Sequence, residues 1–271
     1  MASSSMGPQR IICLTEESTE WLYLLGEAER IVGISGYTVR PKQARLEKPR
    51  VSSFLDGKQD KILALKPDLV IGFSDMQAAL ADRLIRAGLN VWITNQRSIE
   101  EIFQTMSMLA SLVGAQEPAA RWIDACREQH RRIAEQAKAR GPALRAYFEE
   151  WDEPMISAIR WVSELMAIAG GQDIFEDLSR QSLGKDRIVT NAQQVIDANP
   201  QIIFGSWCGK KFRPERLKAR EGWHLIDAIR DDQLYEIKSS EILQPGPAAL
   251  SDGLARMHQC IGKFWSETKE N

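Results

Sequence analysis

Residues 117–140 read EPAARWIDACREQHRRIAEQAKAR and predict one long, uninterrupted helix. Apolar side chains recur along it at steps of three and four, and charged side chains occupy the opposite side. Pro118 stands where a first-turn proline is tolerated, and the pair Gly141-Pro142 ends the run. At about 1.5 Å per residue the helix spans roughly 36 Å, a length that suits a rod joining two lobes.

The sequence on the two sides of this helix repeats one plan. Residues 62–73 and residues 194–205 both read as a helix, a proline and a buried strand. Residues 24–32 and 168–175 both read as a helix end, a glycine and a strand, and the two pairs occur in the same order. We therefore predict an α/β fold of two related lobes bridged by a single long helix, with a ligand cleft between the lobes.

The alternation of strands and helices sets the expected boundaries. We place an N-terminal α/β lobe at residues 10–113, the bridging helix at 114–142 and a C-terminal α/β lobe at 143–271. Expected strands cover residues 10–14, 31–35, 51–53, 68–73, 90–94, 144–149, 201–205 and 233–237. The other expected helices cover residues 17–25, 76–87, 162–169 and 247–265.

Composition excludes several classes of protein. The 271 residues carry a net charge of −2 and are 44% hydrophobic and 27% charged, so a basic nucleic-acid-binding surface is not expected. No window reaches the 18 or more apolar residues of a membrane span, and the first ten residues, MASSSMGPQR, lack an export signal. We expect a cytoplasmic location for the chain as written, and a periplasmic one if a signal was removed. The isolated residues Cys13, Cys126, Cys208 and Cys260 predict reduced thiols and no metal site.

Aromatic residues gather where the predicted strands end. In open parallel sheets, ligands bind beyond the carboxyl ends of the strands. The first lobe places Tyr37, Phe54 and Phe73 there, and the second places Trp151, Trp207 and, in a predicted loop, Trp161. This set predicts a large planar or partly apolar ligand held by stacking, although packing inside one lobe is the alternative for each aromatic.

Two other features near these strand ends have competing interpretations. Acidic residues follow the strand at 144–149, and they indicate either a solvated strand end or a site for a cation or donor-rich ligand; they are Glu149, Glu150, Asp152 and Glu153. Cys208 lies in a turn after a strand, which is one position of a nucleophile, but its spacing is not that of a nucleophile elbow. His224 and His258 are distant in sequence, so we assign no catalytic residue.

Nearly the whole chain, residues 10–263, resembles the class III substrate-binding proteins of ABC importers, the group that carries vitamin B12, haem and iron-siderophores. The resemblance rests on residues 31–37 (IVGISGY), 63–70 (LALKPDLV), 87–91 (AGLNV), 169–171 (AGG) and 198–203 (ANPQII). Residues 206–209 (SWCG), 160–162 (RWV) and 245–247 (PGP) are similar to a cobalamin-binding branch, many members of which lack an export signal.

The resemblance implies a ligand in the cleft between the lobes, with aromatic residues packed on a corrin ring. The matching positions are Tyr37 and Phe54, with Phe73 and Trp151 as further candidates. It also implies docking on a permease through an acidic residue of each lobe; Asp60 falls at the first of these positions, and no second one is assignable. Without export such docking is in question, and a cytoplasmic carrier, sensor or corrinoid-handling role becomes the alternative.

Taken together, these features predict a monomeric, non-enzymatic protein that binds a corrinoid as its ligand, with an ABC permease as a possible partner and no cofactor. The predicted binding residues are Tyr37, Phe54, Phe73, Met76, Trp151, Trp161, Trp207 and Cys208. Haem is one alternative ligand, with Tyr37, Met76 or Cys208 as its axial ligand. An anionic iron-siderophore is another, held by Lys210, Lys211 or Arg187. A cytoplasmic enzyme and a regulatory module read by a protein partner are further alternatives.

Overall fold

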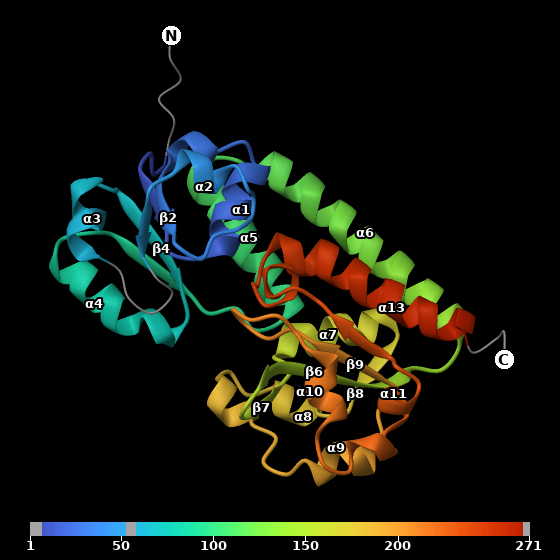
Figure 1. Cartoon of the computed structure of the whole chain (residues 1–271). Coiled ribbons are helices and arrows are strands. Elements are labelled where there is room, and N and C mark those ends of the chain that lie inside the picture. Colours follow the sequence, from blue (N-terminus) through green and yellow to red (C-terminus); the bar gives the residue numbers. More distant parts are fainter. Residues whose placement is uncertain (1–6, 53–57, 268–271) are drawn as a thin grey trace. The chain divides into compact units, whose positions relative to one another are not determined.

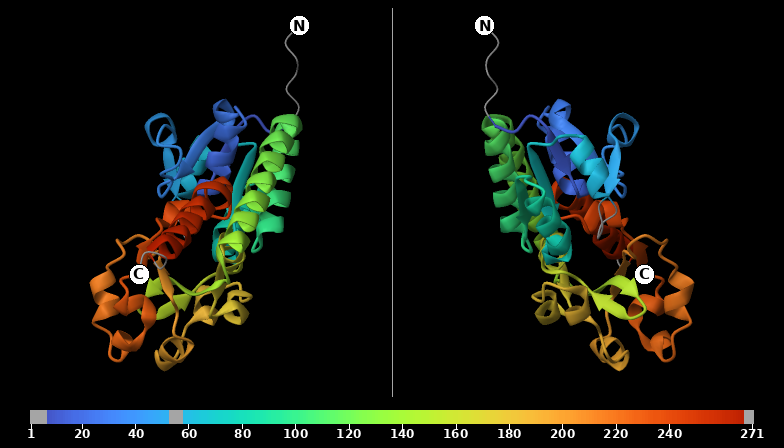
Figure 2. Two further views of the ribbon diagram at one scale, coloured as in Figure 1. Left: turned by 90° about the vertical axis from the view of Figure 1, so that its right-hand side faces the viewer. Right: turned by 90° about the vertical axis from the view of Figure 1, so that its left-hand side faces the viewer.

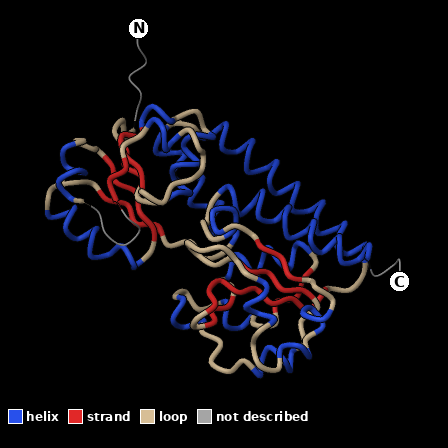
Figure 3. Tube along the Cα trace, in the orientation of Figure 1, coloured by secondary structure: helices blue, strands red, loops and turns tan. Residues whose placement is uncertain are grey.

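A computed structural model describes residues 7–52 and 58–267, and the chain divides into two compact units (Figure 1). Unit 1 runs to Gln96 and includes Glu100–Asp124, whereas unit 2 takes up Arg97–Ile99 and the chain from Ala125 onward. Each unit contains its own sheet, and the strands of the two sheets are drawn in red in Figure 3. The predicted α/β fold of two lobes is confirmed.

The predicted long helix is confirmed as α6 (Gln116–Arg140), which both views of Figure 2 show as one continuous helix in green. Its first part belongs to unit 1 and its remainder to unit 2. In unit 1, the Trp122 ring packs edge to face on Trp21 at 5.3 Å. In unit 2, His130 lies with its Nε2 2.7 Å from the Leu250 carbonyl oxygen. The helix therefore contributes packing contacts to both units.

Unit 1 is built on a parallel sheet in the order β3-β2-β1-β4-β5. Its strands are β1 (Ile11–Cys13), β2 (Ile31–Ser35), β3 (Arg50–Ser52), β4 (Leu69–Phe73) and β5 (Val91–Thr94). Ile12 and Val70 pack with the helices α3 (Gln59–Ala64) and α4 (Ala78–Arg86) on one side of the sheet. On the other side lie α1 (Glu16–Leu24) and α5 (Ile99–Val113), linked by a hydrogen bond from Trp21 Nε1 to the Met106 carbonyl at 2.8 Å (Figure 1).

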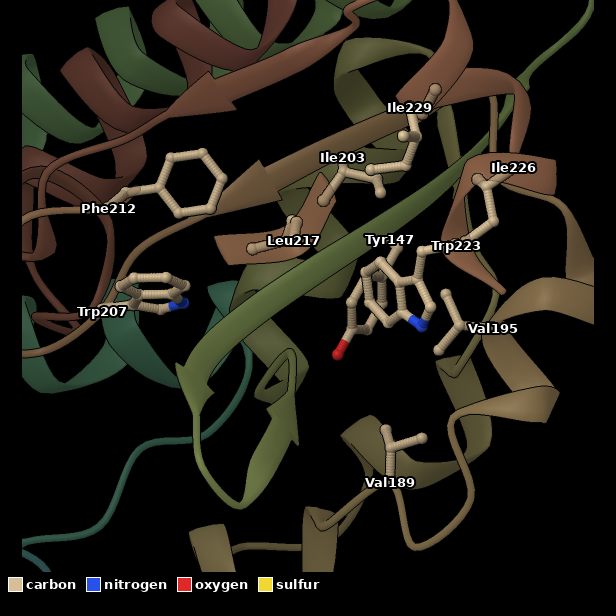
Figure 4. Packing of buried hydrophobic residues seen from close by; sticks show 11 residues of the cluster. Tyr147, Val189, Val195, Ile203, Trp207, Phe212, Leu217, Trp223, Ile226 and Ile229 are labelled. Atoms are coloured by element: carbon tan, nitrogen blue, oxygen red, sulfur yellow. The ribbon is translucent and has the colours of Figure 1, made fainter. Parts of the chain in front are cut away.

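Unit 2 is built on a sheet in the order β10-β9-β6-β7, with β8 paired to β6. Its strands are β6 (Leu144–Asp152), β7 (Met155–Ser157), β8 (Gly171–Asp173), β9 (Ile202–Gly205) and β10 (Leu234–Glu236), of which only β7 pairs antiparallel among the described residues. Figure 4 shows the apolar cluster of this unit, in which Tyr147 and Ile203 from the sheet pack against Trp223 and Ile229.

The helices of unit 2 complete its two faces. They are α7 (Arg160–Ala169), α8 (Glu176–Ser179), α9 (Gln193–Ala198), α10 (Pro214–Lys218), α11 (Asp227–Arg230), α12 (Ser239–Ile242) and α13 (Leu254–Glu267). A π-helical turn, Ala249–Gly253, leads into α13, so the predicted closing helix is confirmed but starts with an irregular turn. The short α2 (Ala44–Glu47) of unit 1, like α8 and α10 to α12, has too few residues for a helical period to stand out in the sequence.

The internal repeat is confirmed in the order of the strands. The order β2-β1-β4-β5 in unit 1 matches β8-β6-β9-β10 in unit 2, and all of these neighbours pair in parallel. The repeated segments of the sequence, residues 62–73 and 194–205, are α3 with β4 and α9 with β9. Both units therefore place the loops after their strands at the carboxyl edge of a parallel sheet.

Three local predictions are wrong. The strand predicted to end at residue 149 continues to Asp152 and returns as β7, because the turn at Glu153-Pro154 makes a hairpin of this segment. The helix predicted from residue 76 starts at Ala78, since a 3-10 turn precedes it and the Ser74 Oγ accepts the Met76 N–H at 3.2 Å. Trp161, predicted in a loop, lies in the first turn of α7.

The close approach of Phe212 to Gly205 in β9 gives the first testable prediction. A Cβ at Gly205 would lie 2.0 Å from the buried Phe212 ring, so we expect Gly205→Ala to lower the free energy of unfolding by about 1–3 kcal/mol through overpacking. Gly184→Ala is the matched control, because its nearest neighbour lies at an ordinary 3.5 Å. Urea denaturation of both variants checks this, and equal stabilities would contradict the packing described for β9.

Candidate functional site

The carboxyl edge of the unit 1 sheet presents two of the predicted binding residues to solvent. Tyr37, in the turn after β2, is 65% exposed, and Met76, in the turn after β4, is 48% exposed. Phe73 is the last residue of β4 and is buried, with its N–H donating to Gln77 Oε1 at 2.9 Å. Phe54 lies outside the described residues. At this edge, Tyr37 and Met76 are the predicted side chains that offer surface to a ligand.

The loop that carries Tyr37, residues 36–41, is held by the first turns of α1. The Val39 N–H donates to Glu16 Oε2 at 2.9 Å, and Arg40 Nε donates to Glu20 Oε1 at 2.9 Å. Gly36 donates its N–H to the Ser52 carbonyl at 2.7 Å, and a Cβ at Gly36 would lie 2.9 Å from that oxygen. Two carboxyl groups and a glycine thus fix the position of this loop.

Glu16 and Glu17 are buried beside this loop, and the sequence analysis did not single them out. Burial, then repulsion from Glu20 and Glu17, raises the pKa of Glu16 to about 8 against the opposing hydrogen bond from Val39. Burial likewise raises the pKa of Glu17 to about 7, although the Thr15 hydroxyl donates to it at 2.6 Å. Acidic residues in the first turn of a helix usually indicate a favourable interaction with the helix dipole, so their sequence pattern alone does not signal burial.

The carboxyl edge of the unit 2 sheet carries a cluster of aromatic and charged side chains. Trp151, half-buried at the end of β6, donates its Nε1–H to the Glu153 carbonyl at 2.8 Å. Lys210 Nζ lies 4.0 Å from the Trp151 ring centroid and forms an ion pair with the buried Asp152, which also pairs with Arg216 Nη1 at 2.6 Å. Burial by itself would raise the pKa of Asp152, but its cationic partners, Lys210 most strongly, lower that pKa. The Asp152 carboxylate is therefore held in its charged form.

Glu149 organises the interior of the same edge and is fully buried. It accepts hydrogen bonds from Tyr147 Oη at 3.1 Å and Trp207 Nε1 at 3.1 Å, and the two terminal nitrogens of Arg220 donate to it at 2.6 and 3.0 Å. The Trp207 ring is buried and packs edge to face on Phe212 at 5.1 Å (Figure 4). Trp207 is therefore part of the apolar core in this structure.

The interpretation of the acidic run as a solvated strand end is wrong for Glu149, Glu150 and Asp152, whereas Glu153 is exposed. Glu149 pairs with Arg220, Asp152 pairs with Lys210 and Arg216, and Glu150 receives two hydrogen bonds from the buried Arg187 at 2.7 and 3.1 Å. The sequence analysis could not identify these ion pairs, because the basic partners of the acidic residues lie 37 to 71 positions away along the chain. Because Arg187 is buried and donates to Glu150, it is not available to bind an anionic ligand as the sequence analysis predicted.

The two remaining predicted residues of unit 2 lie in different surroundings. Trp161 is buried in α7, where its Nε1–H donates to the Ile242 carbonyl at 2.9 Å. Cys208 is exposed in the turn after β9. Partial desolvation of its thiol, and then the negative charge of Glu150, raise the pKa of this thiol. A raised pKa keeps less of the thiol as the reactive thiolate, which disfavours a nucleophilic role.

Residues 7–52 and 58–267 contain no group of three or more His, Cys, Asp or Glu side chains arranged to hold a metal ion. None of the helices within these ranges combines the length and the apolar character that crossing a membrane requires. Asp60, the residue implied in docking, is exposed on α3.

Comparison with known proteins adds a consistent set of similarities. The periplasmic binding protein family model matches residues 11–241. A vitamin B12-binding protein of Vibrio cholerae is 26% identical over 251 residues, covering 89% of this chain and 85% of the relative. A Bacillus subtilis protein described as an uncharacterized ABC transporter substrate-binding lipoprotein is 22% identical over 263 residues, covering 94% of this chain and 80% of the relative.

Solved structures share the fold. The periplasmic vitamin B12 binding protein of Vibrio cholerae superposes with a TM-score of 0.76 at 23% identity, covering 96% of this chain and 98% of that structure. A periplasmic heme binding protein of Pseudomonas aeruginosa superposes with a TM-score of 0.81 at 21% identity, covering 96% of this chain and 93% of that structure.

The buried Glu149 gives a prediction about stability. Glu149→Gln removes the charge that faces Arg220 and leaves this partly buried guanidinium without its counter-ion, so we expect a loss of about 3 kcal/mol in the free energy of unfolding. Glu215→Gln, at an exposed position of α10, is the matched control. Chemical denaturation measures both, and a loss of less than about 0.5 kcal/mol for Glu149→Gln, the range of ordinary surface substitutions, would contradict the role assigned to Glu149.

Glu16 and Glu17 give a prediction about pH. Both folded-state pKa values lie above the ordinary value of 4.5, so their contribution to stability is complete below about pH 4.5 and is lost as the pH rises through 7 and 8. We expect the double variant Glu16→Gln, Glu17→Gln to lose less stability than the parent chain between about pH 6 and pH 9, by on the order of 1–3 kcal/mol.

Urea denaturation at the two pH values measures this difference. Glu117→Gln, at an exposed position of α6, is the control and should keep the parent dependence on pH. The same dependence in the double variant as in the parent chain would show that these two carboxyls do not titrate in this range.

Proposed function

The chain belongs to the periplasmic binding protein family, and from this premise we propose that it is a binding protein of the ABC-importer type whose ligand is a corrinoid. One observation carries the choice of ligand: a vitamin B12-binding protein of Vibrio cholerae is 26% identical over most of both chains. The similarity also supports the expectation made from the sequence, where residues 206–209 and 160–162 pointed to a cobalamin-binding branch.

Aromatic surface at the carboxyl edges supports a large, flat ligand. Tyr37 and Met76 at the edge of unit 1 expose an aromatic ring and a polarisable thioether, both of which make favourable contacts with an extended ring system. Trp151 at the edge of unit 2 is half-buried beneath Lys210. In this proposal Tyr37 and Met76 contact the corrin ring, and Trp151 with Lys210 offers a second aromatic ring and a cation to such a ligand.

The proposed role is non-enzymatic. The relatives named above are described as binding proteins, and the raised pKa of the Cys208 thiol does not favour nucleophilic chemistry. The proposed partner is a permease that contacts the exposed Asp60, and the proposed state is a monomer. A cytoplasmic location stays a prediction from the sequence, whereas a periplasmic one is the alternative that the descriptions of the relatives favour.

Haem is a second candidate ligand because of Tyr37. Its ring is 65% exposed at the carboxyl edge, and a phenol oxygen is one of the axial ligands that haem iron takes in proteins. A shift of the Soret band of hemin on addition of the protein, lost in Tyr37→Phe, would favour haem over the corrinoid.

Tyr37 also gives the test of the corrinoid proposal. We expect cyanocobalamin to bind with one equivalent per chain in isothermal titration calorimetry, and Tyr37→Ala to weaken the affinity by about tenfold or more because a stacking face is removed. Leu46→Ala is the control, since Leu46 is an apolar residue on α2, before the amino end of β3, and is even more exposed than Tyr37. A flat titration of the parent chain, under conditions where the protein is folded, would end the corrinoid proposal.

A further inference from the structure

Four buried side-chain oxygens at the carboxyl edge of the unit 1 sheet have no hydrogen-bond partner within the described ranges. They are Glu16 Oε1, Glu17 Oε2, Thr38 Oγ1 and Ser52 Oγ. Glu16 and Glu17 start the helix that follows β1, Thr38 lies in the loop after β2, and Ser52 ends β3. Because β1, β2 and β3 are neighbours in a parallel sheet, all four residues belong to the same edge.

Unpaired buried polar groups are costly, because each loses its hydrogen bonds with water and gains none in the protein. The neutral hydroxyls of Thr38 and Ser52 are unpaired as well, so the deficit is not explained by the two acidic residues alone. Protein interiors usually satisfy such groups, so a cluster of exceptions calls for an explanation such as strain, a functional role or a bound partner. This edge therefore keeps unused hydrogen-bonding capacity, and the unpaired Glu16 and Glu17 oxygens accept hydrogen bonds when these carboxyls are ionised.

The exposed Tyr37 places a ligand close to these acceptors. The Val39 N–H bonds to Glu16 at 2.9 Å, and Tyr37 stands two residues earlier, within about 7 Å of extended backbone. A ring that stacks on Tyr37 therefore brings its peripheral groups to the start of α1, where the two carboxyls lie.

The charge at this edge is acidic. The other charged groups that act on Glu16 and Glu17 are Glu20, from the same helix, and Arg40, from the loop after β2. Arg40 Nε bonds to Glu20 at 2.9 Å, so its charge is largely balanced by that carboxylate. At a pH above both pKa values, where Glu16 and Glu17 are ionised, a ligand with peripheral carboxylates would face like charges here.

We propose that Glu16 and Glu17 select a ligand whose periphery carries amide N–H donors and reject one whose periphery carries carboxylates. The inference rests on the proposed function and deepens it, because it names the chemistry of the ligand groups at that same edge. Among flat tetrapyrrole-like ligands, it favours a corrinoid with its carboxamide side chains over haem with its propionates.

Two probes with the same corrin ring and cobalt test this selection. Dicyanocobinamide carries peripheral amides, and dicyanocobyrinic acid carries carboxylates at the same positions. By isothermal titration calorimetry at about pH 9, where both carboxyls are ionised, and at fixed ionic strength, we expect the amide probe to bind at least about tenfold more tightly than the acid. Equal affinities, or tighter binding of the acid, would overturn the inference and leave the corrinoid proposal intact. If neither probe binds, the proposed function itself fails.

Variants assign the selection to the two residues. In the double variant Glu16→Gln, Glu17→Gln we expect the affinity ratio to fall by about tenfold toward one, because the Gln amides donate to carboxylates and carry no charge. Glu117→Gln on α6 is the control and should keep the parent ratio. An unchanged ratio in a folded double variant would overturn the assignment. Thermal melting checks folding, and the ratio measured with the parent chain decides the selection even if the double variant does not fold.

Discussion

Parallel pairing of a central strand with its neighbours is the constraint on which both units depend. In unit 1, β1 pairs in parallel with β2 and β4, and in unit 2, β6 pairs in parallel with β8 and β9. Parallel strands place every loop that follows them at one edge, so residues far apart in sequence meet there. Val39 and Glu16 meet in this way in one unit, as Trp151 and Lys210 do in the other.

The two edges share a strand order but differ in how they treat buried charge. In unit 2, each of the carboxylates of Glu149, Glu150 and Asp152 has an arginine or lysine partner, although the buried Ser206 Oγ after β9 has no hydrogen-bond partner among the described residues. In unit 1, Glu16 and Glu17 keep one unpaired oxygen each. A duplicated scaffold therefore supports one edge whose buried carboxylates are paired with cations and one whose buried carboxyls keep hydrogen-bonding capacity.

Much of the fold could be predicted because its signals are local. The proline junctions at residues 62–73 and 194–205 fixed two helix ends and two buried strands, and the apolar stripe of residues 117–140 fixed α6. The hairpin of β6 and β7 was missed because the sequence after residue 149 alternates charged and aromatic residues, a pattern also found in exposed loops. Trp161 was predicted in a loop because the predicted helix started at residue 162, whereas α7 starts at Arg160; local patterns define helix boundaries least well.

The sequence by itself determined the α/β class, the duplication and the long helix, since these follow from periodicity and from the backbone limits of proline and glycine. It also determined which aromatics follow the strands. Only the tertiary structure decided that Trp207 and Trp161 are buried while Tyr37 is exposed, and that Glu149 meets Arg220 across 71 positions of the chain. Burial and charge pairing depend on which distant segments share a sheet edge, and no local pattern in the sequence specifies that neighbourhood.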